Sequence, residues 1–138
     1  MGLQAQLSAT LTTGPSSLTD QQFPSGVTSI SFGLNPPTKP YTVSTGAVVT
    51  IQSPSSPVSV DSIGTGGQVT QATTFYARTS AQMLVTLVCA DPGGGADHTS
   101  VIPINGLMGP IEFPSNGYLK SLSVQGSGTF EYWAAGNL

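Results

Sequence analysis

Few side chains in this sequence could do chemistry. His98 is the only histidine and Cys89 the only cysteine. General acid–base catalysis usually relies on a histidine or a close pair of carboxylates, and glycoside hydrolysis needs two carboxylates that face each other across the sugar. The spacing of the six carboxylates selects no such pair, so the sequence predicts no catalytic residue and a protein that is not an enzyme. These carboxylates are Asp20, Asp61, Asp91, Asp97, Glu112 and Glu131.

The same scarcity bears on metals and cofactors. A single histidine excludes a zinc site built from several histidines. Segment 91–97, Asp-Pro-Gly-Gly-Gly-Ala-Asp, carries two carboxylates but lacks the oxygen spacing and the terminal glutamate of an EF-hand. Its glycines also lack the Lys-Ser/Thr of a phosphate-binding loop. We therefore expect no metal, no cofactor and a hairpin loop at 91–97, with calcium at this loop left open as the alternative.

Cys89 lies in an apolar run, Met-Leu-Val-Thr-Leu-Val-Cys-Ala at 83–90. This context is typical of a buried structural thiol rather than of a nucleophile. A lone cysteine also favours folding in a reducing cytoplasm. Residues 1–6 show no signal-peptide pattern, and no apolar run approaches the roughly 20 residues of a membrane helix. We therefore expect synthesis in the cytoplasm.

Alternation of apolar and polar residues dominates the chain. Segment 3–12 alternates leucine and alanine with glutamine, serine and threonine, which predicts a strand with one buried face. Prolines and glycines interrupt the pattern at 35–40, 53–57 and 126–128. No window favours a helix. The predicted strands are 3–12, 27–32, 41–43 with 47–51 (one bulged strand or two short ones), 58–63, 73–78, 82–90, 99–104, 109–114, 118–124 and 129–135.

A count of eight to ten short strands among these segments predicts an all-β fold. Their spacing is typical of a single-domain antiparallel β-sandwich or jelly roll over 1–138. Segment 1–14 is a candidate N-terminal arm or exchanged strand. Near the end of the chain, alternation places Phe130 and Tyr132 on one face and Glu131 and Trp133 on the other. One face belongs to the core. We favour a subunit contact over a sugar-binding site for Trp133, because tryptophan is enriched at such contacts.

The composition points to a surface that is poor in charge. Only 7% of the residues are charged, against about 25% in a typical soluble domain, and the net charge is −3. Weak self-repulsion favours association, so the chain suits either a secreted domain or a subunit packed against neighbours. Lys39, Arg78 and Lys120 are the only cations and lie far apart in sequence. They cannot neutralise a run of phosphates, which excludes nucleic acid as the main partner.

Four segments in the second half of the chain carry a resemblance to a known family: 75–79, 101–106, 111–114, and 122–128 with 130–132. Together they cover less than half of the chain. They resemble small structural proteins of tailed bacteriophages, especially the head decoration (cement) proteins. The resemblance implies a β-sandwich or jelly-roll homo-oligomer, often a trimer. Such a protein binds the major capsid protein on the outer head lattice, so its location is the virion. It implies no active-site residues and no membrane partner.

The expected contact segments are the arm 1–14, the proline-rich segment 35–40 and the tail 133–138. The alternatives are a receptor- or carbohydrate-binding module of a spike or fibre, a tail or head–tail subunit, and a hydrolase whose site we do not recognise. The candidate interface residues are Leu3, Leu7, Leu11, Pro36, Pro37, Trp133 and Leu138.

Overall fold

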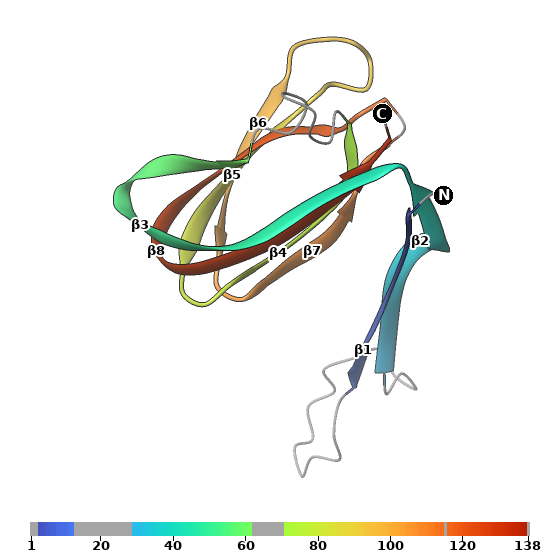
Figure 1. The fold of residues 1–138 in the computed structure, drawn as a ribbon, viewed down its shortest axis with the longest axis horizontal. Helices are drawn as coiled ribbons and strands as arrows, with labels where there is room; N and C mark the ends of the chain where they lie inside the picture. Colours follow the sequence, from blue (N-terminus) through green and yellow to red (C-terminus); the bar gives the residue numbers. More distant parts are fainter. Residues whose placement is uncertain (1–2, 13–28, 62–70, 115, 138) are drawn as a thin grey trace, which may run out of the picture. The chain divides into compact units, whose positions relative to one another are not determined.

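The computed structural model describes residues 3–12, 29–61, 71–114 and 116–137. Within these ranges the chain forms strands and no helix, which confirms the all-β prediction (Figure 1). The strands are β1 (Leu3–Thr12), β2 (Ser29–Tyr41), β3 (Val43–Asp61), β4 (Ala72–Thr79), β5 (Met83–Cys89), β6 (His98–Ile104), β7 (Leu107–Glu112) and β8 (Leu119–Gly136).

Contacts within the chain divide it into two units, Gln4–Pro40 and Met1–Leu3 with Tyr41–Leu138. In the first, β1 and β2 form a two-stranded sheet. β1 has the predicted bounds. β2 is longer than predicted, because it continues through the proline-rich segment 35–40 that we expected to interrupt it. Each strand of a two-stranded sheet has a free edge, where the missing N–H of proline costs no ladder hydrogen bond.

In the second unit, β3 to β8 form a curled antiparallel sheet in which β8 is central. β3 pairs with β8 along nearly its whole length, from Val43–Gly136 to Asp61–Leu122. On its other side, β8 pairs first with β5 and then, further along, with β4. β6 flanks β5, and β7 flanks β4. The sheet therefore consists of four long runs of chain in the order β3, β8, β4–β5 and β7–β6.

The two ends of the central strand β8 come close together, although the edges of the sheet stay open. Pairing between β4 and β8 runs from Ala72–Gly136 to Thr79–Phe130, so these two strands run in opposite directions. Ala72 makes one further bridge, of the parallel kind, with Leu119 at the start of β8. Because Leu119 and Gly136 are the two ends of one strand, this bridge closes the curl of the sheet.

All four runs bend at one level, which we call the fold line. Figure 1 shows β3 and β8 turning together there. The fold line crosses β3 between Ser53 and Val58, β8 at 126–128, the β4–β5 run at 80–82 and the β6–β7 run at 105–106. Side chains hold it: the N–H of Thr129 donates to Ser80 Oγ at 2.8 Å, and Gln125 Nε2 donates to the carbonyl of Pro54 at 3.0 Å.

The fold line explains why two predicted breaks are wrong. We expected a turn at 53–57 and two separate strands at 118–124 and 129–135, but β3 and β8 each run through as one bent strand. β3 absorbs the bend in a register shift, and β8 absorbs it at Gly126 and Gly128, where φ is +147° and +143°. Glycine adopts these angles at no steric cost, so pairing continues across the bend.

The core lies inside the curl. β5 shows most clearly how a strand contributes to this core: Met83, Val85 and Leu87 are buried, and the residues between them are partly exposed. This is the period-two pattern of a strand with one buried face. Cys89 continues that face and packs against the core, but it is only partly buried, so the predicted buried thiol is confirmed in part. The largest fully buried apolar side chains are Phe75, Met83, Val85, Leu119, Leu122, Val124 and Phe130.

Candidate binding surface

A row of four side chains crosses the outer face of β3, β8, β4 and β7. Val48 pairs with Glu131, Glu131 with Arg78, and Arg78 with Leu107. Paired residues on neighbouring strands point to the same side of a sheet, so the row forms one surface. Val48 and Leu107 at its ends are 66% and 61% exposed. Between them, Arg78 Nη2 lies 2.8 Å from Glu131 Oε2. Two exposed apolar side chains thus flank one ion pair.

A second row, formed by Gly46, Trp133 and Tyr76, lies beside the first. A Cβ atom at Gly46 would lie 2.7 Å from the carbonyl oxygen of Tyr132 and 3.4 Å from Trp133 Cδ1. The missing side chain therefore lets the indole sit close to β3 and leaves a shallow depression of about 370 Å³ beside it. We call Val48, Tyr76, Arg78, Leu107, Glu131 and Trp133 together the Trp133 surface.

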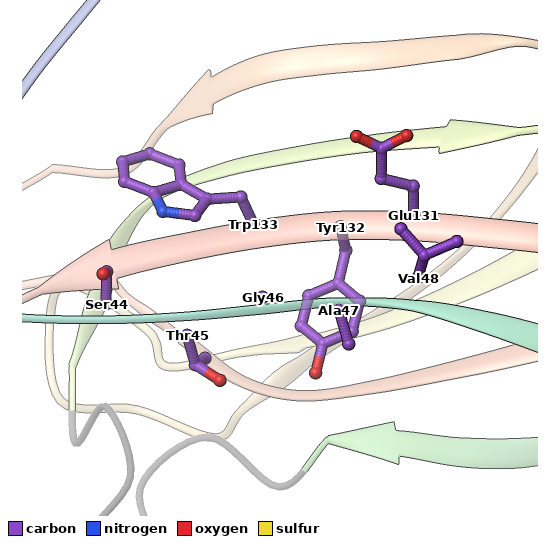
Figure 2. Close-up of a pocket in the computed structure, with 8 residues that line it drawn as sticks. All are labelled: Ser44, Thr45, Gly46, Ala47, Val48, Glu131, Tyr132 and Trp133. Atoms are coloured by element: carbon purple, nitrogen blue, oxygen red, sulfur yellow. The ribbon is translucent and has the colours of Figure 1, made fainter.

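The side chains around the depression point to two sides of the sheet. In Figure 2, Trp133 and Glu131 point to one side of the strands and Tyr132 points to the other. Tyr132 and Phe130 are buried, with stacked rings 5.9 Å apart. This confirms the alternation predicted for this segment. Trp133 therefore belongs to the outer face.

A buried tyrosine orients Trp133. The rings of Tyr41 and Trp133 meet edge to face, with centroids 6.0 Å apart and planes at 80°. Tyr41 is 3% exposed, and its hydroxyl forms a hydrogen bond with Thr74 Oγ1. An aromatic pair of this geometry is worth about 0.5–1.5 kcal/mol beyond the area it buries. The indole is thus held in place before any partner binds, which lowers the entropic cost of binding.

The groups of the Trp133 surface are suited to binding another molecule. Its two charged groups form an ion pair with each other, and exposed pairs of this kind contribute about 0–1 kcal/mol to stability. Its aromatic and aliphatic groups offer stacking and burial of apolar area. Among the described residues, no group of three or more His, Cys, Asp or Glu side chains could hold a metal ion.

A second polar cluster organises the loop at 91–97. Asp91 Oδ2 accepts hydrogen bonds from the N–H groups of Gly93 and Gly95 at 3.0 and 2.8 Å, and His98 Nε2 donates to Asp91 Oδ1 at 2.8 Å. The hydrogen bond from His98 is the largest cause that lowers the pKa of Asp91, followed by the bond from Gly95. The Asp91 carboxylate thus stabilises the turn that follows it by accepting hydrogen bonds from backbone N–H groups of the same loop, as Asp does in many turns.

Two neighbours of this loop also have shifted pKa values. Lys120 Nζ lies 2.7 Å from Asp97 Oδ2, and this hydrogen bond raises the pKa of Lys120. Cys89 pairs with His98 across β5 and β6, so the fold brings a thiol, an imidazole and the Asp91 carboxylate to one end of the sheet. Burial, and then the charge of Asp97, raise the pKa of Cys89. A raised pKa keeps the thiol protonated and disfavours a nucleophilic role.

The loop should respond to acid in a defined way. Because the pKa of Asp91 is lower in the folded chain than its ordinary value of 3.8, its hydrogen bonds stabilise the loop at all pH values above about 3.8 and are lost only on further acidification. In an NMR titration we expect the transition of the Gly93 and Gly95 amide resonances that reports the Asp91 carboxyl to have its midpoint below pH 3.8. In Asp91→Ala both amides should lack this transition, and a transition that persists there would contradict the assignment.

Of the predicted interface residues, only Trp133 can be placed by its side chain. Leu3, Leu7 and Leu11 lie in β1, and Pro36 and Pro37 lie in β2, but their side chains are outside the described part of the structure, as is Leu138.

Sequence reasoning missed the neighbours of Trp133. Val48 and Leu107 are on strands far apart in sequence, and only the register of β3, β8, β4 and β7 brings them into one row. Gly46 gave a weak signal, because it interrupts an alternating strand, and a glycine there often marks a close approach.

Two further findings concern the chain as a whole. The described residues include no helix long and apolar enough to cross a membrane. Comparison of the chain with protein-family models, with curated proteins and with solved structures gives no match.

Proposed function

We propose that this chain is a non-enzymatic structural protein of a virion, a decoration protein that binds the outer head lattice as a homo-oligomer and stabilises it. In this proposal the curled sheet is a sandwich or jelly roll of the kind that the family resemblance implies, and the major capsid protein is the partner. The observation that carries the proposal is the Trp133 surface: an oriented tryptophan beside a row in which two exposed aliphatic side chains flank an ion pair, on a chain with very few charges.

The physical argument rests on desolvation. Burying an exposed valine or leucine side chain completely is worth roughly 1.5–3 kcal/mol. The Arg78–Glu131 pair is already formed, so a partner need not supply a counter-charge for either group. One such surface gives modest affinity. Repetition around an oligomer and over a lattice raises the overall affinity through effective concentration, so a small subunit with few charges can bind a large shell stably.

The unit formed by β1 and β2 supports assembly independently. A two-stranded sheet is at best marginally stable by itself. The sequence of β1 alternates leucine and alanine with polar residues, which gives the strand one apolar face. Segment 1–14 therefore remains the proposed arm for contact with a neighbouring subunit.

The test is co-sedimentation with heads of the virus whose genome encodes the chain, purified without this protein. Leu107→Asp places a charge at the end of the Trp133 surface and should weaken binding by roughly tenfold or more, which corresponds to ~1.4 kcal/mol per factor of ten. Val101→Asp is the matched control, because Val101 is 58% exposed on β6, outside this surface. Failure of the unaltered chain to bind heads would overturn the proposal.

A second candidate, a carbohydrate-binding module, is favoured by one detail. The depression beside the Trp133 indole is also lined by Ser44 and Glu131, which offer a hydroxyl and a carboxylate next to a stacking ring. In that case Trp133→Ala would abolish glycan binding while Leu107→Asp, at the far end of the surface, would leave it unchanged. Equal loss of head binding in both variants favours the protein contact.

A further inference from the structure

The curled sheet has two edges that differ in how well they are protected. One edge is the β6–β7 run, which carries Pro103 and Pro110 and bends at 105–106. Prolines and bends are the usual devices that stop an edge strand from pairing with another chain. The other edge is β3, with which no strand but β8 pairs among the described residues.

The first part of β3 has none of these devices. From Val43 to Ser53 it pairs with β8 without a register shift, and it contains no proline and no charged residue. The two prolines of β3, Pro54 and Pro57, lie beyond this stretch at the fold line. Val48 at its midpoint is 66% exposed. A long, neutral edge strand in unbroken register is a template for a further strand.

We propose that the occupant of this edge is the same segment of a second copy of the chain, paired antiparallel about a two-fold axis at Val48. The segment is complementary to itself. Val48 meets Val48 of the second copy, a pairing of β-branched residues that favours sheets. Ser44 would lie opposite Gln52, and Gly46 opposite Thr50. Because every side chain in the stretch is neutral, no like charges meet anywhere along the pair.

The pairing has a consequence for binding. A two-fold axis between antiparallel strands is perpendicular to the sheet, so both copies keep their outer faces on the same side. The two Trp133 surfaces would then form one continuous face, joined at Val48, that could bind a lattice bivalently. The inference rests on the homo-oligomer of the proposed function and names its contact. It predicts an even number of subunits, whereas the family resemblance implies a trimer.

The test uses the purified full-length chain, with Val48→Lys and Val48→Glu made separately. Each variant places like charges opposite each other at the two-fold axis, so sedimentation equilibrium should show half the mass of the unaltered chain. An equimolar mixture should restore the original mass, because lysine then faces glutamate. Val101→Lys is the matched control, since it adds the same charge at a 58% exposed valine on the protected edge, and its mass should not change. Circular dichroism and Trp133 fluorescence confirm that each variant is folded.

The outcomes separate this inference from the proposed function. An unaltered chain that is a monomer or a trimer, or a Val48→Lys variant of unchanged mass, overturns β3 pairing, while head binding by the unaltered chain still decides the proposed function. A half-mass variant that the mixture does not rescue also overturns the pairing, because the charge would then act elsewhere. Loss and recovery of mass in step with charge complementarity would support it.

Discussion

Phe130→Ala should lower the free energy of unfolding by about 3–5 kcal/mol, the usual cost of truncating a buried phenylalanine. Phe130 is fully buried and lies in the central strand, paired with Val49 of β3 on one side and Thr79 of β4 on the other. Its ring also stacks on Tyr132. The substitution therefore removes buried apolar area and breaks an aromatic pair. It also leaves a cavity that the neighbouring strands cannot move in to fill, because β8 is paired on both sides.

Urea denaturation followed by the fluorescence of Trp133, the only tryptophan, measures this loss. Leu107→Ala is the control: the side chain is 61% exposed, so its removal should change stability by no more than about 0.5 kcal/mol. A loss below about 1 kcal/mol in Phe130→Ala would mean that the core is not built around this ring.

The elements predicted best are those whose signal is local. Strand 3–12 follows from its alternation, and the strands observed as β4, β5 and β6 follow from short segments rich in apolar and β-branched residues. Two of the errors occur at the fold line. There the local signals at 53–57 and 126–128 indicate a break, but the hydrogen-bond pairing of β3 with β8 continues past both segments. A bulge in β3 and two glycines at positive φ in β8 bend the strands without ending them. Pairing between distant segments overrides a local turn signal, and one sequence does not reveal that pairing.

In the candidate surface, too, features set by one strand could be predicted, whereas features set by the pairing of several strands could not. That Trp133 shares a face with Glu131 and not with Tyr132 follows from counting along a single strand, and the structure confirms it. Which of the two faces is outward was not predicted and comes from the structure. That Val48 and Leu107 lie in the next row depends on the register of four strands. Register is set by how the whole sheet packs, so these neighbours could not be found from the sequence. The hydrogen bonds of Asp91 depend only on residues up to seven positions away, and the glycine-rich segment already predicted a loop there.

Gly126→Ala should cost about 2–6 kcal/mol of unfolding free energy, because it combines backbone strain with overpacking, each worth roughly 1–3 kcal/mol. Gly126 has φ +147°, an angle that residues with a side chain rarely adopt. A Cβ atom there would lie 2.9 Å from Cγ of Met83 and 3.3 Å from the carbonyl oxygen of Gln82. Met83 is only 1% exposed, so it has little room to move away.

Gly106→Ala separates the two contributions. Gly106 also lies on the fold line, with φ +107°, but a Cβ atom there would meet nothing within 4 Å. It should therefore cost only the strain, about 1–3 kcal/mol, and remain more stable than Gly126→Ala in the same urea titration. Equal losses in the two variants would show that Met83 does not press against β8, and the account of how the central strand bends would have to change. A larger loss at Gly126 would show that the fold line is locked by packing as well as by the backbone, since β8 could bend there only where no side chain stands between it and β5.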